Sequence, residues 1–392
     1  MTKPIVSAEE FAERRRRAVA ACKSKGLDAL LVCSRGGGTL DRYADVLYLT
    51  NYYPFFPYIP DFEGSWSARA HSLLVLPVDG NGSGELIIDG AQDGRIRFDG
   101  KITNTAFVVD ETERALKAAK LGSARIGLVG SDVMTVRMQD KLRNALPDLK
   151  LSMADDILVS LRSIKSPTEV ALLRRASEVG SRMMDAMLKA SEPGAAHGEI
   201  VAAGLNQLVP VGGILYNSFM ASGRGGDPSK LVKSNFPTWG STERLNKGDW
   251  IRFGISGAVD GYMFDLARAK AVGSTTNRQV ELFEAAIACI QATLDAIKPG
   301  ATAGDLGAAG LGKQESMGYT VDGVFVAMGH GIGLTWDDPW LARGVKTEIA
   351  PNMVLSVERT ITHDGYLGDF EETVLVTPDG YELITDAQQR NW

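Results

Sequence analysis

The sequence has few of the residue types that cross-link a chain or hold it in a membrane. Its 392 residues include only three cysteines, which are odd in number and far apart, so neither a disulfide framework nor a paired-cysteine metal site is expected. No apolar run reaches the length of a membrane span, and the first ten residues lack the pattern of a secretory signal. These absences favour a reduced, cytoplasmic setting without a membrane partner.

Basic residues are not in excess, and histidine is scarce. The 42 Lys and Arg side chains against 48 Asp and Glu give a net charge of −6, which argues against nucleic acid as a partner. The four histidines are His71, His197, His330 and His363, so any imidazole chemistry must use one of them. The apolar fraction of 44% and the charged fraction of 23% are ordinary for globular proteins, and the length favours two domains.

The first 160 residues alternate helical and strand patterns, which predicts an α/β layer domain. The basic residues 14–17 lie within the first helix and are expected to face solvent. A capping-box sequence, Ser166-Pro167-Thr168-Glu169, then starts a long helix. We therefore predict domains at 1–160 and 161–392. The elements expected in the first domain are helices at 7–25 and 131–146 and strands at 27–33, 71–76, 85–88 and 124–128.

An internal repeat divides the second domain into two halves. Residues 193–204 (PGAAHGEIVAAG) and 299–310 (PGATAGDLGAAG) agree at seven of twelve positions, at an offset of 106. Each copy follows a long helix and precedes a β-hairpin pattern, which predicts an α+β domain with an internal pseudo-two-fold repeat. The first hairpin is expected at 250–272 with its turn at 258–261, and the second at 353–377 with a loop at 362–368.

Acidic residues recur on these hairpins at positions related by the repeat. Glu358 and Glu371 lie on the two strands of the second hairpin, and Asp265 precedes Glu371 by the repeat offset. The counterpart of Glu358 falls near residue 254, which is a glycine. The two hairpins thus supply three inward carboxylates where the symmetry predicts four.

His330 adds a nitrogen donor to the three carboxylates. It lies in a glycine-rich segment, Gly329–Gly333, where the backbone can approach a site closely. One imidazole and three carboxylates form a harder donor set than the thiolates and histidines usual for zinc. We therefore predict one divalent ion, Mn²⁺, Fe²⁺ or Co²⁺ with zinc as an alternative. Its expected ligands are Asp265, His330, Glu358 and Glu371.

Short motifs in both predicted domains are similar to motifs of one enzyme superfamily. They are Glu10–Leu31, Leu47–Thr50, Arg162–Glu169, Lys247–Asp249, Gly261–Arg268 and Gly329–Leu334, the last of which matches a GHGxGL motif. Together they resemble the creatinase/prolidase/methionine-aminopeptidase superfamily over nearly the whole chain. The resemblance implies a creatinase-like N-terminal domain, a second domain with the pita-bread fold, and a homodimer.

The resemblance also implies a metal centre, with departures from the peptidase pattern. Peptidases of the superfamily hold two bridged ions with five side chains, and four of these positions are the residues proposed above. The fifth, an aspartate, is Gly254 here, so the resemblance implies a site for a single ion. Two histidines of the peptidases are missing as well, because Trp336 stands at one position and Ser234 is nearest to the other.

Aromatic residues gather in segments expected to face the site. One group lies in residues 52–66 of the first domain, and others are close in sequence to the metal ligands. They predict either interface packing or an aromatic-walled pocket for a small molecule. The candidate substrate contacts are Trp336, Tyr53 and Phe264.

Two further residues near the proposed ligands have testable positions. His363 lies between the two glutamate ligands in sequence and is a candidate acid or base, with an exposed loop position as the alternative. Arg268 falls on the opposite strand face from Asp265 by parity, so we assign it to the support of the fold.

The leading hypothesis is a hydrolase that cleaves a small, non-peptide C–N bond of the amide type. One divalent ion would lower the pKa of water and polarise the carbonyl, and the resemblance implies that Glu358 accepts the proton. The catalytic candidates are Glu358, His330 and His363. The alternatives are a metal-dependent lyase that abstracts a proton and eliminates, an Xaa-Pro dipeptidase or aminopeptidase, and a non-catalytic binding protein.

Overall fold

The computed structural model describes residues 4–38, 40, 42–54, 56–90, 94–298, 300–321 and 325–392. The chain forms two compact units, Met1–Arg162 and Ser163–Trp392. Phe55 of the aromatic segment and Pro299 of the second repeat copy lie outside the described residues. Among the helices of the described ranges, none combines the length and the apolar character needed to cross a bilayer.

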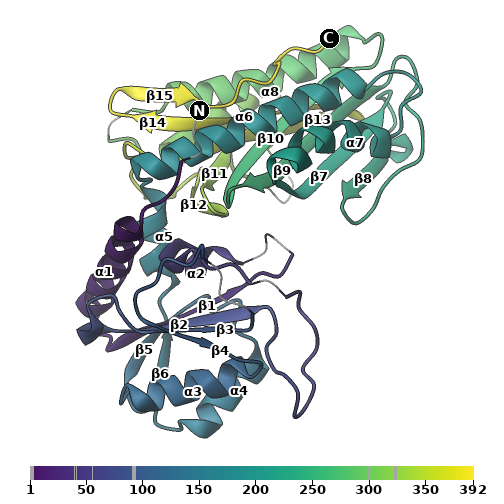
Figure 1. Cartoon of the computed structure of the whole chain (residues 1–392). Helices are drawn as coiled ribbons and strands as arrows, with labels where there is room; N and C mark the ends of the chain where they lie inside the picture. Colours follow the sequence, from purple (N-terminus) through teal and green to yellow (C-terminus); the bar gives the residue numbers. More distant parts are fainter. Residues whose placement is uncertain are drawn as a thin grey trace. The chain divides into compact units, whose positions relative to one another are not determined.

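A six-stranded sheet forms the centre of the first unit, with the strand order β4-β3-β2-β1-β5-β6 (Figure 1). Strand β1 (Ala29–Arg35) runs antiparallel to β2 (His71–Pro77) and parallel to β5 (Arg125–Val129). Their sequences are nearly continuous apolar runs, which is typical of strands covered on both faces. The other elements are β3 (Glu85–Ile88), β4 (Lys101–Asn104), β6 (Lys150–Met153), α1 (Ala8–Ser24), α2 (Ala44–Thr50), α3 (Val108–Ala118), α4 (Val136–Ala145), α5 (Asp155–Ser163) and a 3₁₀ helix (Val78–Gly80).

Each half of the second unit has a pair of helices. Helix α6 (Pro167–Ala190) begins at the Ser166 capping box and packs with α7 (His197–Leu208). Helix α8 (Asn277–Asp295) packs with α9 (Ala303–Ser316). The two repeat copies therefore encode the starts of α7 and α9, where an acidic residue at the third helical position bonds the backbone N–H of the N-cap residue.

Two antiparallel sheets carry the hairpins of the two halves. The first has the order β10-β9-β7-β8 and the second β12-β11-β13-β14-β15. Helix α6 packs on β9 and β10, and α8 packs on β13 and β14, so the two halves repeat one arrangement (Figure 1). The strands are β7 (Ile214–Gly223), β8 (Val232–Phe236), β9 (Trp250–Val259), β10 (Tyr262–Ala271), β11 (Gly329–Ile332), β12 (Trp336–Trp340), β13 (Val354–His363), β14 (Tyr366–Thr377) and β15 (Gly380–Leu383), with 3₁₀ helices at Val209–Val211 and Pro228–Lys230.

Both hairpins turn through an Asp-Gly pair. Asp260 and Gly261 have φ angles of 56° and 86°, and Asp364 and Gly365 have φ angles of 50° and 73°. Two consecutive left-handed residues are the signature of a tight type I′ turn, for which Asp-Gly is a preferred sequence. The loop expected at 362–368 is therefore wrong, because pairing continues to His363 and Tyr366 on either side of the turn.

Candidate metal centre

Four strands bring the proposed ligands to one place in the second unit. Glu358 on β13 and Glu371 on β14 are direct cross-strand partners, so their side chains share one face of the sheet. His330 on β11 pairs with Ser356, two residues from Glu358, and so lies on the same face. The Thr373 hydroxyl of β14 donates to the carbonyl oxygen of Asp265 (3.0 Å), which joins the second sheet to β10 at the site.

The donor atoms are close enough to share one ion. One ligand atom each from Asp265, His330 and Glu371 lies within 4.8 Å of the others. His330 Nε2 is 3.8 Å from Asp265 Oδ2 and 3.6 Å from Glu358 Oε1. His330 Nδ1 lies 2.8 Å from the carbonyl oxygen of Gly331, so Nδ1 carries the proton and Nε2 keeps its lone pair toward the carboxylates.

The site concentrates like charges in a buried place. Burial, followed by the charge of Glu358, raises the pKa of Asp265 well above its usual range. Burial, followed by the charges of Asp265 and Glu358, does the same to the pKa of Glu371. Burial and the neighbouring Asp369 raise the pKa of Glu358 to about 7, while burial lowers the pKa of His330. A neutral imidazole and crowded carboxylates are the donor set that a divalent cation neutralises, so these residues fit such an ion.

Strand β9 offers no side chain to the site at residue 254. Gly254 pairs with Ala267 and faces the same side of the sheet as Asp265. A Cβ atom added at Gly254 would have its nearest neighbours at 3.8–4.0 Å, which is ordinary contact distance. The structure therefore has room for a Cβ atom at residue 254, where the sequence supplies none.

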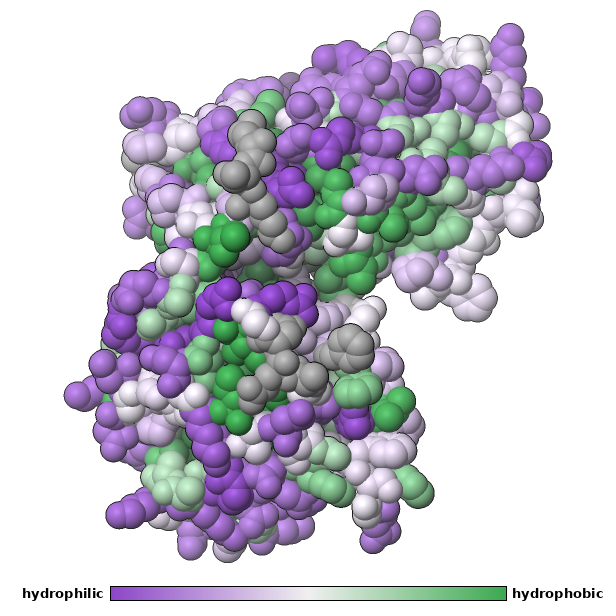
Figure 2. Space-filling view, in the orientation of Figure 1, coloured by the Kyte–Doolittle hydropathy of each residue, from purple (hydrophilic) through white to green (hydrophobic). Residues whose placement is uncertain are grey.

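Two indoles flank His330. Trp336 lies on β12 with 39% of its surface exposed, and its Nε1 donates to Asp265 Oδ2 (2.5 Å). The rings of Trp336 and Trp340 are 6.0 and 5.3 Å from the His330 ring. Figure 2 shows hydrophobic surface gathered over part of this unit. Phe219 and Trp239 are among the exposed aromatic residues that the structure describes in this unit. Trp336 thus adjoins the proposed ligand Asp265, and a contact between Trp336 and substrate stays a prediction.

Phe264 and His363 do not lie with the ligands. Phe264 is fully buried in the core under α6, because neighbouring residues in a strand point to opposite faces and Asp265 takes the site face. His363 is at the hairpin end, five residues from Glu358, and its ring contacts Tyr319 (5.6 Å), which follows α9. The expected roles of Phe264 in substrate binding and of His363 in catalysis are therefore wrong.

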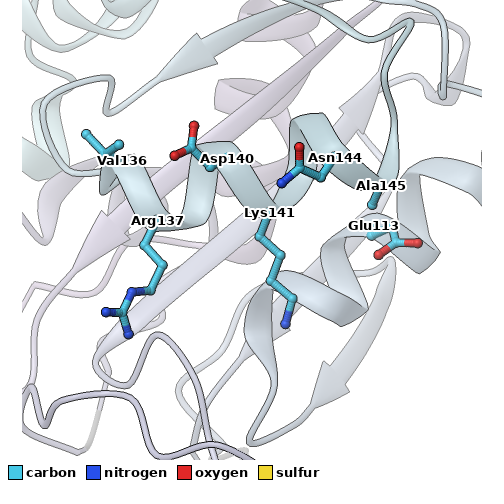
Figure 3. A pocket seen from close by; sticks show the side chains of 7 residues that line it. All are labelled: Glu113, Val136, Arg137, Asp140, Lys141, Asn144 and Ala145. Atoms are coloured by element: carbon cyan, nitrogen blue, oxygen red, sulfur yellow. The ribbon is translucent and has the colours of Figure 1, made fainter.

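Tyr53 belongs to the first unit. Its hydroxyl accepts a hydrogen bond from the backbone N–H of Gly38 (2.9 Å), and its ring lies 5.8 Å from that of Tyr43. A contact between Tyr53 and substrate stays a prediction. A pocket of about 760 Å³ in this unit lies on α3 and α4 and is lined by Glu113, Arg137, Asp140 and Lys141 among others, so it contains none of the predicted site residues (Figure 3).

Three polar residues on the site face were not predicted from the sequence. The Ser356 hydroxyl donates to Glu371 Oε1 (2.7 Å) and fixes the orientation of that carboxylate. Arg252 and Asp369 form an ion pair (2.9 Å) beside the ligands. The signal was present, because Ser356, Arg252 and Asp369 each lie two residues from a position already singled out, and such residues share a strand face.

Gly329 allows β11 to approach β13. It has a φ of 125°, and an added Cβ atom would lie 1.9 Å from the carbonyl oxygen of Ser356. We expect Gly329→Ala to force the strands apart at His330, to destabilise the unit by about 1–3 kcal/mol and to weaken ion binding by about tenfold or more. Thermal unfolding and calorimetric metal titration measure the two effects. Gly312→Ala in α9, where an added Cβ atom meets nothing within 4 Å, is the control: it should leave ion binding unchanged and stabilise the helix by up to about 1 kcal/mol.

Comparison with known proteins places this site in a family. Residues 171–378, more than half of the chain, match metallopeptidase family M24, and residues 14–164 match the creatinase/prolidase N-terminal domain. The chain belongs to metallopeptidase family M24. The resemblance to the creatinase/prolidase superfamily and the expected fold, an α/β N-terminal domain followed by a pita-bread domain, are thereby confirmed.

Relatives of the chain are named as peptidases. An uncharacterized hydrolase/peptidase of Sinorhizobium fredii is 26% identical over 66% of this chain, and an Xaa-Pro dipeptidase of Pyrococcus furiosus is 27% identical over 60% of it. The matches span 65% and 66% of those proteins, less than two thirds of each. The crystal structure of the prolidase from Pyrococcus horikoshii has a TM-score of 0.79 and 19% identity, covering 97% of this chain and all of that one, which shows the fold alone.

Proposed function

We propose that the chain is a metal-dependent hydrolase of an amide-type C–N bond in a small substrate, with one divalent ion at Asp265, His330, Glu358 and Glu371. The observation that carries the proposal is the convergence of ligand atoms from Asp265, His330 and Glu371 within 4.8 Å. A divalent ion held there would supply Lewis acidity, which lowers the pKa of a water molecule and polarises a carbonyl group.

Glu358 and Trp336 have separate roles in the proposed reaction. Glu358 is the most accessible of the three acids, with 28% of its side chain exposed against 10% for Asp265, so it is placed to accept the proton of the attacking water. Trp336, hydrogen-bonded to Asp265, holds that carboxylate and offers an indole face to the substrate.

The substrate class follows from the relatives more than from the site. The name Xaa-Pro dipeptidase in a relative supports a small peptide substrate over the non-peptide amide that the sequence analysis favoured. The names of the relatives reported above give no support to elimination, so we do not retain the lyase alternative. Gly254 and Trp336 remain departures from the peptidase pattern, and a small non-peptide amide is therefore the second substrate class to test. The homodimer and the cytoplasmic setting stay predictions.

Metal titration and product analysis test the proposal together. We expect Mn²⁺ to bind with a stoichiometry of one ion per chain, and a panel of Xaa-Pro dipeptides to be hydrolysed with one solvent oxygen incorporated from ¹⁸O-labelled water. Chelation should abolish turnover, and added Mn²⁺ should restore it. Two ions per chain would contradict the single-ion site, and product formation without ¹⁸O would contradict hydrolysis. Binding of a dipeptide without turnover in the metal-loaded protein would instead favour a binding protein.

A further inference from the structure

A positively charged side chain, that of Arg252, lies beside the proposed metal ligands. Arg252 is on β9, two residues before Gly254 and on the same strand face. Its Nη1 donates to Asp369 Oδ2 (2.9 Å), and the two side chains are 25% and 3% exposed. Asp369 also accepts a hydrogen bond from the Thr360 hydroxyl (2.6 Å), so both of its oxygens are engaged.

The guanidinium of Arg252 lies next to residue 254, where the carboxylate is missing. A Cβ atom built on Gly254 would have Arg252 Nη1 as its nearest neighbour, at 3.8 Å, followed by the Ala267 Cβ at 3.9 Å and the Leu266 carbonyl oxygen at 4.0 Å. An added Cβ atom at residue 254 would therefore meet no clash, and its nearest neighbour would be the charged group of Arg252.

The pair of Arg252 and Asp369 is electrostatically part of the site. Asp369 lies two residues before Glu371 on the same face of β14, and its partner across the sheet, Thr360, lies two residues after Glu358. The group of carboxylates thus extends from Asp265 to Asp369, with a guanidinium at its end.

We infer that Arg252 takes the place of a second metal ion, and that its guanidinium, together with the absence of a ligand at Gly254, limits the site to one ion. Two ions in one site lie about 3.5–4 Å apart, so a second ion at this end would face a fixed positive charge that already holds Asp369. The inference rests on the proposed binding of one ion by the other four residues. It deepens that proposal, because restoring a carboxylate at 254 would give Arg252 a second partner and would not create a metal site.

Substitution of both residues separates the effect of charge from the effect of the missing ligand. We expect one Mn²⁺ per chain in the wild type, in Gly254→Asp and in Gly254→Asp with Arg252→Lys, which keeps the positive charge. Gly254→Asp with Arg252→Gln should bind two, because glutamine is polar and carries no charge. Calorimetric titration and elemental analysis at saturation give the stoichiometry, and anomalous scattering from Mn²⁺-soaked crystals gives the ion positions.

The outcomes are distinct for the two proposals. A wild-type protein that binds no ion would overturn the proposed metal site itself. Two ions in Gly254→Asp alone, or one ion in the double variant with glutamine, would overturn the role of Arg252 and leave the single-ion site in place. Thermal unfolding of each variant shows whether it folds. If Gly254→Asp with Arg252→Gln does not fold, two ions bound to Gly254→Asp alone would still overturn the inference.

Discussion

Glu358→Gln is expected to lower kcat by about three orders of magnitude while leaving the fold and most of the ion binding in place. Glutamine has the shape of glutamate and cannot accept the proton of an attacking water, and removal of a general base costs typically 10²–10⁴-fold. The three donors that lie within 4.8 Å of one another, Asp265, His330 and Glu371, are unchanged in this variant. Ion occupancy near one per chain with a collapsed kcat would separate proton transfer from metal binding.

The comparison requires a control of the same chemistry elsewhere. Glu382 on β15 forms an ion pair with Arg174 at the surface, with 49% of its side chain exposed, so Glu382→Gln should leave kcat and ion occupancy within about twofold of the wild type. Steady-state kinetics on the dipeptide panel, with metal content measured on the same samples, is the test. A Glu358→Gln enzyme with wild-type kcat would remove Glu358 from the mechanism.

The sequence predicted the parts of the fold that depend on local signals. The capping box at Ser166 marks the start of α6, because N-cap chemistry is read within four residues. The repeat at 193–204 and 299–310 predicted two matching halves, and the structure places the starts of α7 and α9 in its two copies. The Asp364-Gly365 turn was missed in favour of a longer loop, although Asp-Gly between strand patterns is a strong local signal.

Burial was harder to predict from the sequence because it is decided by distant segments. Arg15 was expected to face solvent, and it is buried, with its guanidinium bonded to the carbonyl oxygens of Gly82, Leu49 and Arg97. These partners lie 34–82 residues away in the chain. A run of four arginines in one helix therefore says little about which of them meets solvent.

At the site, strand parity explains both what was predicted and what was not. The spacing of the hairpin carboxylates predicted that Asp265, Glu358 and Glu371 lie at one site. Glu358 and Glu371 meet there because cross-strand partners share a face of the sheet. Closeness in sequence was a poor guide, since Phe264 is the immediate neighbour of Asp265 and points into the opposite core. The role of Arg252 could not be predicted for another reason. The sequence of a largely apolar strand does not show which residue its arginine pairs with, and only the fold places Asp369 beside Arg252.

Arg268→Met is expected to give the largest loss of stability, about 3–5 kcal/mol, because it breaks a buried ion pair from one side. Arg268 is fully buried, and its Nη2 donates to Glu372 Oε1 (2.9 Å), where both side chains are at most 3% exposed. The same guanidinium donates to the carbonyl oxygen of Glu371 (2.5 Å) and stacks on Phe370 (4.3 Å to the ring centroid). It thereby ties β10 to β14 directly behind the ligands.

The cost arises from the partner that is left behind, and a second substitution reveals it. Methionine fills much of the volume of arginine but leaves the Glu372 carboxylate buried without a cation. Arg268→Met with Glu372→Gln should therefore recover part of the loss in chemical denaturation, measured as the midpoint at unchanged slope. Arg174→Met, which removes a surface ion pair, should cost less than about 1 kcal/mol. Equal losses for Arg268→Met and Arg174→Met would mean that the strands behind the metal ligands are held by packing, and that the guanidinium contributes nothing specific to them.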